Sequence, residues 1–68
     1  MAEVYIYFFE GRSMDQKRGM VRDVTEAVAR NLEGAAESVI VQLIESPRHA
    51  KAKGGVLYSD MEAPPKKP

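Results

Sequence analysis

Arg12 is the residue whose surroundings suggest chemistry most directly. It lies between a strand-like run and Ser13, which forms with Gln16 the spacing of a capping box at the start of a helix. A guanidinium fork and the amides at the beginning of a helix both favour a carboxylate, and here they would point toward the same small volume. The pattern therefore predicts a carboxylate site at Arg12, with an exposed arginine in a tight loop as the alternative.

A second group of basic residues directly precedes a pair of glycines near the C-terminus. Its members are Arg48, His49, Lys51 and Lys53. No carboxylate or nucleophile stands at a spacing that would pair with His49, so we expect a loop residue rather than a catalyst. The pair Gly54-Gly55 lacks the other residues of a phosphate-binding loop and favours a turn. A solvated loop is the simplest interpretation of this cluster, and the sequence assigns its members no role.

The composition argues against several other classes of chemistry. The chain has one histidine and no cysteine, so it lacks the ligands of a zinc or iron–sulfur site, and we expect neither a metal nor another cofactor. Ten basic residues balance ten acidic ones, which argues against binding to nucleic acid. No apolar run is long enough to cross a membrane. Glu3 and Glu10 fit neither a secretory nor a mitochondrial leader, which predicts a cytoplasmic location.

Three periodic segments must position these residues. Residues 4–9 are β-branched or aromatic at every position, which predicts a strand. Residues 14–32 place apolar side chains three and four apart, as an amphipathic helix does, and Gly34 is well placed to end it in a left-handed conformation. Residues 39–44 form a nearly unbroken apolar strand of the kind found in parallel sheets. The predicted fold class is α/β, a single right-handed βαβ unit with two parallel strands.

The rest of the chain adds little to this unit. Residues 56–58 follow the glycine pair and predict a short C-terminal hairpin. We expect one domain over residues 1–58 and a flexible tail, rich in proline and lysine, over residues 59–68. A chain of 68 residues without a disulfide or a metal usually needs a partner subunit to be stable. Both faces of the strand at residues 4–9 are apolar or aromatic, and one helix covers only one of them, so we expect an oligomer.

Five motifs in fixed order resemble the short-chain tautomerases typified by 4-oxalocrotonate tautomerase. They are Glu10-Gly11-Arg12-Ser13, Gln16-Lys17, the helical stretch at residues 22–32, the strand start at residues 38–41, and Gly54-Gly55. The likeness extends over residues 2–57 without a gap. It implies a hexamer, a trimer of βαβ dimers. It also implies proton transfer on unsaturated keto acids, in which an N-terminal proline acts as general base and arginines hold a dicarboxylate substrate.

The chain departs from that family pattern at the base. The position of the catalytic proline holds Ala2, the second family arginine corresponds to Ile40, and the aromatic residue that lines the pocket corresponds to Lys51. Arg12 alone remains of the catalytic set. If Met1 is removed, Ala2 offers a primary amine with a pKa of about 7.7 to 8.0, but without the ring of proline.

The resemblance therefore implies the proline-lacking subunit of a heterohexameric tautomerase involved in degrading aromatic compounds. A homologous, proline-bearing partner would supply the base, and this chain would lend Arg12 to bind a substrate of the 2-hydroxymuconate or 4-oxalocrotonate type. One alternative is a non-catalytic homohexamer that binds an anionic ligand or a protein. Another is a self-sufficient enzyme of altered specificity that uses the amine of Ala2.

Overall fold

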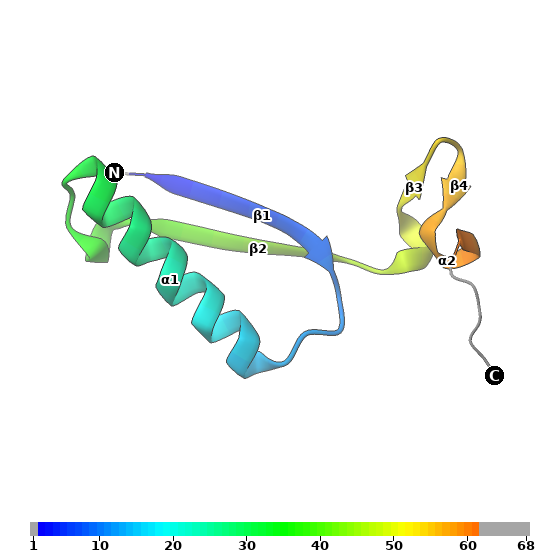
Figure 1. The fold of residues 1–68 in the computed structure, drawn as a ribbon, viewed down its shortest axis with the longest axis horizontal. Coiled ribbons are helices and arrows are strands. Elements are labelled where there is room, and N and C mark those ends of the chain that lie inside the picture. Colours follow the sequence, from blue (N-terminus) through cyan, green and yellow to red (C-terminus); the bar gives the residue numbers. More distant parts are fainter. Residues whose placement is uncertain (1, 62–68) are drawn as a thin grey trace.

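The computed structural model describes residues 2–61, which form a βαβ unit followed by a hairpin and a short helix (Figure 1). The elements in chain order are β1 (Glu3–Phe9), α1 (Met14–Leu32), β2 (Ile40–Ser46), β3 (Ala52–Lys53), β4 (Val56–Leu57) and α2 (Tyr58–Met61). A 3₁₀ turn lies on either side of β2, at Ala36–Ser38 and at Arg48–Ala50. The predicted order of strand, helix, parallel strand and hairpin is confirmed.

The sheet of the βαβ unit consists of β1 and β2 in parallel register, with Val4 beside Val41 and Ile6 beside Leu43. The side chains alternate between a less exposed and a more exposed face, because successive residues of a strand point to opposite sides. Parallel strands end at the same edge of the sheet. At that edge the Glu10 N–H donates a hydrogen bond of 3.0 Å to the Ser46 carbonyl. The segments that follow β1 and β2 therefore begin side by side.

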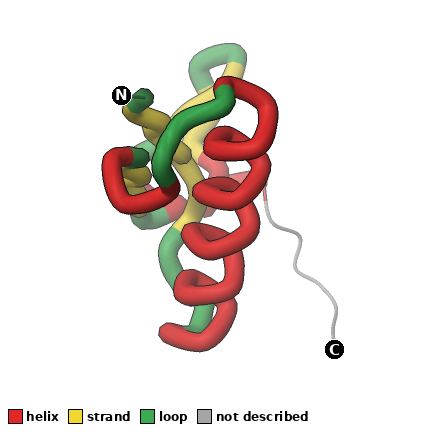
Figure 2. Tube along the Cα trace, turned by 90° about the vertical axis from the view of Figure 1, so that its left-hand side faces the viewer, coloured by secondary structure: helices red, strands yellow, loops and turns green. Residues whose placement is uncertain are grey.

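Helix α1 begins as the sequence predicts and lies along one face of the sheet (Figure 2). The Gln16 N–H donates to Ser13 Oγ at 3.1 Å, and the Ser13 N–H donates to Gln16 Oε1 at 2.9 Å, which completes the capping box. Lys17 Nζ lies 2.6 Å from Glu45 Oε2 and ties the first turn of the helix to β2. These contacts fix the position of the loop that carries Arg12.

Helix α1 ends at Leu32 as predicted, but the left-handed residue that follows it is not the predicted one. Glu33, not Gly34, takes the left-handed conformation, with φ of 55° and ψ of 42°. The reason is the hydrogen bonding of the last turn: the helix stops at Leu32, and the Gly34 N–H then reaches back to the Ala29 carbonyl at 3.1 Å. Glu33 lies between Leu32 and Gly34, so it is the residue that must turn the chain.

The face of the sheet opposite α1 is not covered by any of residues 2–61. Tyr5 and Tyr7 are 52% and 69% exposed, and none of residues 2–61 is fully buried. The radius of gyration is 16.1 Å, whereas a compact chain of this length has about 11 Å.

On this face the Tyr5 hydroxyl donates a hydrogen bond of 2.6 Å to Glu3 Oε1. This bond, with the negative charge of Glu3, raises the pKa of Tyr5 above the ordinary tyrosine value.

The hairpin of β3 and β4 extends away from the βαβ unit, beyond the C-terminal end of β2 (Figure 1). Its turn consists of Gly54 with φ of 61° and Gly55 with φ of 84°. Two successive residues with positive φ are typical of a two-residue hairpin turn that glycine tolerates best. The predicted turn at the glycine pair is confirmed.

Helix α2 runs to Met61, so residues 59–61 are helical although they were expected to belong to a flexible tail. Two contacts of Tyr58 explain this difference. Its N–H donates to the Lys51 carbonyl at 2.8 Å, and its ring packs against Phe9. The remaining residues of the expected tail, 62–68, lie outside the described residues. Among residues 2–61, no helix combines the length and the apolar composition needed to span a bilayer.

Candidate functional site

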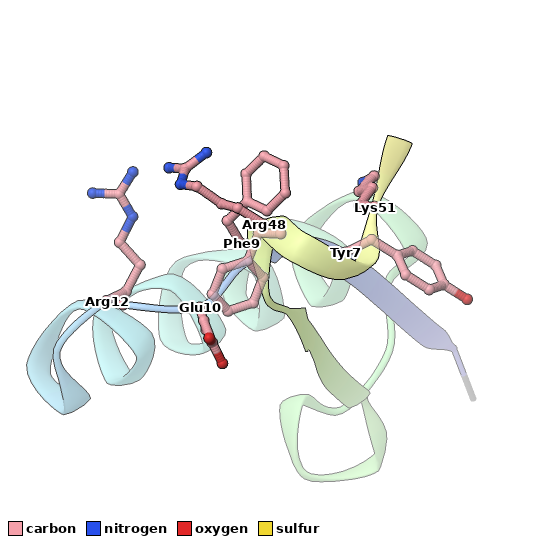
Figure 3. Close-up of a pocket in the computed structure, with 8 residues that line it drawn as sticks. Tyr7, Phe9, Glu10, Arg12, Arg48 and Lys51 are labelled. Carbon is pink, nitrogen blue, oxygen red and sulfur yellow. The ribbon is translucent and has the colours of Figure 1, made fainter. Parts of the chain in front are cut away.

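A cavity of about 440 Å³ opens at the edge of the sheet where β1 and β2 end (Figure 3). Its walls come from two parts of the chain, the end of β1 with the loop before α1, and the segment after β2. The lining residues are Tyr7, Phe8, Phe9, Glu10, Gly11, Arg12, Arg48 and Lys51. The parallel pairing of the strands explains this arrangement, because it brings both connecting segments to one edge.

Positive charge dominates the cavity. Arg12, Arg48 and Lys51 line it, and among residues 2–61 Glu10 is the one carboxylate that does so. The side chains of Arg12 and Arg48 extend to the same side of the chain, whereas the carboxylate of Glu10 points to the other side (Figure 3). A concave surface lined by one sign of charge attracts small ligands of the opposite sign. The site is therefore suited to an anion.

Phe9, the last residue of β1, organises the basic side chains. The guanidinium carbon of Arg48 lies 4.3 Å from the centroid of its ring, and Lys51 Nζ lies 5.5 Å from it. The ring of Tyr58 meets that of Phe9 edge to face, with 4.9 Å between the centroids and 70° between the planes. These contacts hold the segment after β2 against the end of β1.

The structure places Arg12 in this cavity but changes the predicted reason for a carboxylate site. Gly11 has φ of 117°, a conformation that glycine favours, and it turns the chain out of β1 toward Ser13. The amides of Ser13 and Gln16 already have side-chain partners in the capping box. The positive charge that would attract a carboxylate therefore comes from the side chains of Arg12, Arg48 and Lys51, and not from the amides of Ser13 and Gln16.

Ala2 lies at the other end of β1. The Ile40 N–H donates to the Ala2 carbonyl at 2.9 Å, and Ala2 lines a separate cavity of about 100 Å³ beside the C-terminal end of α1. The strand between Ala2 and the Arg12 loop is seven residues long, which corresponds to about 20 Å. A single chain thus does not bring Ala2 or Ile40 together with Arg12.

The residue patterns did not indicate that Arg48 and Lys51 join Arg12, since both were interpreted as parts of a solvated loop. Both line the cavity, while His49 and Lys53 are not among its lining residues. Only the family resemblance places Lys51 at a pocket position. The available signal was topological, since residues that follow two parallel strands meet at one edge. The part of the chain that the structure describes holds no group of three histidine, aspartate or glutamate residues that could bind a metal ion.

A family model described as "Tautomerase enzyme" matches residues 4–55. The chain belongs to the tautomerase family. A probable tautomerase of Bradyrhizobium diazoefficiens is 40% identical over 67 residues, which cover 98% of this chain and 100% of the relative. A 2-hydroxymuconate tautomerase of Pseudomonas putida is 40% identical over 50 residues, which cover 74% of this chain and 79% of that enzyme. The chain is thus a member of a family of isomerases.

Solved structures show the same fold. A homologue of 4-oxalocrotonate tautomerase is 41% identical and superposes with a TM-score of 0.84, covering 93% of this chain and 100% of the homologue. A heterohexamer 4-oxalocrotonate tautomerase from Chloroflexus aurantiacus is 26% identical, with a TM-score of 0.83 and coverage of 91% and 100%. The βαβ unit with its C-terminal hairpin is therefore the fold of this tautomerase.

Proposed function

We propose that this tautomerase is one subunit of an isomerase that moves a proton on unsaturated keto acids of the 2-hydroxymuconate or 4-oxalocrotonate type. In this proposal Arg12 binds the substrate, and the N-terminal proline of a partner chain is the general base. The observation that carries the proposal is the position of Arg12 in a cationic cavity that lacks Ala2, the residue at the place of the family's proline.

Arg12 suits the role of carboxylate anchor for two reasons. Its guanidinium group can make paired hydrogen bonds to a carboxylate, and such charge-assisted bonds contribute about 1.5 to 3 kcal/mol each. It also lies between Glu10, whose N–H is bonded to the Ser46 carbonyl, and the capped start of α1, so its loop is held at both ends. An anchor on a loop held in this way restricts the orientation of the substrate toward the base, which is what proton transfer requires.

The base must come from elsewhere if proton transfer is to be fast. Ala2 has no pyrrolidine ring, and general-base catalysis contributes about 10²- to 10⁴-fold to the rate of such reactions. The Chloroflexus aurantiacus tautomerase is a heterohexamer, so at least one related protein assembles from different chains. A mixed assembly in which a homologous subunit carries the proline would give this chain a complete site.

The uncovered face of the sheet supports assembly. Tyr5 and Tyr7 expose large aromatic surfaces, and the described residues include no buried core. Large apolar surfaces of this kind mark contacts with other subunits. We propose a hexamer built as a trimer of dimers, in which contacts between chains bring a partner's base to the cavity that contains Arg12.

The test is to measure tautomerase activity with 2-hydroxymuconate for this chain alone and after assembly with a proline-bearing homologous subunit. Native mass spectrometry of the same samples gives the subunit composition. We expect little activity from the chain alone and restored activity from the mixed complex. Full activity of a preparation that contains only this chain, with Met1 removed, would instead support a self-sufficient enzyme that uses the Ala2 amine.

A non-catalytic anion-binding homohexamer is the second candidate, and the cationic cavity is the observation that favours it. The same samples distinguish the two. If this chain forms only homohexamers that bind a dicarboxylate, and no proline-bearing subunit joins them, the isomerase proposal is wrong. Entry of a proline-bearing subunit together with turnover rules out the second candidate.

A further inference from the structure

We propose that Arg48 and Lys51 form a second anion-binding subsite beside Arg12, which makes the cavity selective for substrates with a negative charge at both ends. The inference rests on the proposed function for the role of Arg12 as anchor of one carboxylate. It adds the residues that hold the other end of the substrate and thereby determine specificity.

The first argument is the charge of the cavity. Three cationic side chains are among its described lining residues, and the carboxylate of Glu10 points to the other side from Arg12 and Arg48 (Figure 3). The volume of about 440 Å³ lies within the range of small-molecule sites, about 300 to 1,000 Å³. A ligand with a carboxylate at each end can contact more of these cations than a ligand with one carboxylate.

The second argument is the way in which Arg48 and Lys51 are held. Both lie over the ring of Phe9, at 4.3 Å and 5.5 Å from its centroid. A cation over an aromatic face is attracted by the ring quadrupole and keeps its full charge in that contact. Phe9 is itself fixed by the edge-to-face contact with Tyr58. The two cations thus have a rigid support at the wall of the cavity.

The third argument is that the two cations lie on a different segment from Arg12. Arg12 belongs to the loop before α1, and the pair belongs to the segment after β2. An elongated ligand can therefore contact both segments, one with each end. Arginine favours a carboxylate through its planar fork, and lysine acts as a point charge for a carboxylate or a polarised carbonyl oxygen. The chemistry points to an unsaturated dicarboxylate.

The test uses two ligands that share one carbon chain. Trans,trans-muconate carries a carboxylate at each end, and sorbate carries a carboxylate at one end and a methyl group at the other. Isothermal titration calorimetry gives the affinity of each ligand for the assembled protein at fixed ionic strength, without turnover. We expect the assembled wild-type protein to bind muconate about tenfold or more tightly than sorbate.

The variants Arg48→Gln and Lys51→Gln should each weaken muconate binding by about tenfold or more and leave sorbate binding nearly unchanged. Lys53→Gln is the matched control, because it removes the same charge from β3 but Lys53 does not line the cavity. It should change neither affinity. The variants Arg48→Lys and Lys51→Arg keep the charge and should retain the preference, so they decide the case if Arg48→Gln fails to assemble.

Equal binding of muconate and sorbate by the wild type would overturn the inference. So would a loss from Lys53→Gln as large as that from Lys51→Gln, since the effect would then be general attraction. If variants lose the preference for muconate as expected but no mixed complex turns over 2-hydroxymuconate, the proposed function fails and the subsite stands. If turnover is found and no preference exists, only the subsite is wrong.

Discussion

The substitution Tyr7→Asp should abolish assembly and, with it, the folded state of the chain. Tyr7 is 69% exposed, so of the roughly 200 Å² that an aromatic side chain can bury, about 140 Å² is available for a subunit contact. At about 25 cal/mol per Å² this area contributes about 3.5 kcal/mol for each copy. A two-fold contact contains two copies, hence about 7 kcal/mol, or about 10⁵-fold in the dissociation constant. Aspartate also introduces a carboxylate that would be costly to bury.

The assay combines sedimentation velocity with thermal unfolding followed by circular dichroism, over about a hundredfold range of protein concentration. For the wild type, the melting temperature should fall on dilution, because dissociation precedes or accompanies unfolding. Tyr7→Asp should sediment as a monomer without a cooperative transition. Tyr7→Phe keeps the ring and serves as the control, which should still assemble. A compact wild-type monomer whose melting temperature does not depend on concentration would refute the reasoning, and with it every shared site proposed above.

Three further predictions concern the site and the sheet. Ala2→Pro, with Met1 removed, should raise the tautomerase activity of the chain alone by about 10²-fold or more, because it supplies the missing base to the site that Arg12 helps to form; no gain in a properly assembled variant would argue against Arg12 as the anchor. Arg12→Gln in the mixed complex should lower kcat/KM by about tenfold or more, and unchanged kinetics would identify Arg12 as an ordinary surface residue. The raised pKa of Tyr5 means that its bond to Glu3 stabilises the fold below the ordinary tyrosine pKa, and that this stability is lost as the pH rises through the folded-state value. Glu3→Gln should move the phenolate absorbance of one tyrosine to lower pH, and identical titration curves would contradict this assignment.

The βαβ unit could be predicted from the sequence because each segment carries one unmistakable period. Residues 4–9 and 39–44 have the composition of buried strands, and both lie within the observed β1 and β2 except for Val39, which precedes β2. Helix α1 has the predicted bounds because its start has a capping box. The left-handed residue after Leu32 was not predicted, since Glu33 takes that conformation in place of Gly34. Propensity favours a residue for that position but does not determine it.

The cavity could not be predicted to the same extent. Arg12 was recognisable from its two neighbours in the chain, but the contacts of Arg48 and Lys51 with Phe9 join residues about 40 positions apart. No local pattern encodes such a contact. Tyr58 likewise ends the hairpin in the sequence, whereas in the structure it fixes the ring on which the basic residues lie. Long-range contacts of this kind depend on where the chain turns after β2.

The topology also supports the proposal that a complete site needs more than one chain. In a parallel βαβ unit the C-terminal ends of both strands share one edge, and the N-terminal ends share the opposite edge. Arg12, Arg48 and Lys51 lie at the first edge, and Ala2 with Ile40 at the second. No side chain is long enough to span the length of β1.

An isologous contact between the uncovered faces that runs the sheets in opposite directions would place the first edge of each chain near the second edge of its partner. Each dimer would then contain two sites, and in each of them a base at the start of one chain would lie near the anchor that follows β1 of the other chain. A mixed dimer would therefore contain one site with a proline base and one with Ala2, so in a complex of this chain with a proline-bearing subunit we expect half of these sites to be catalytic.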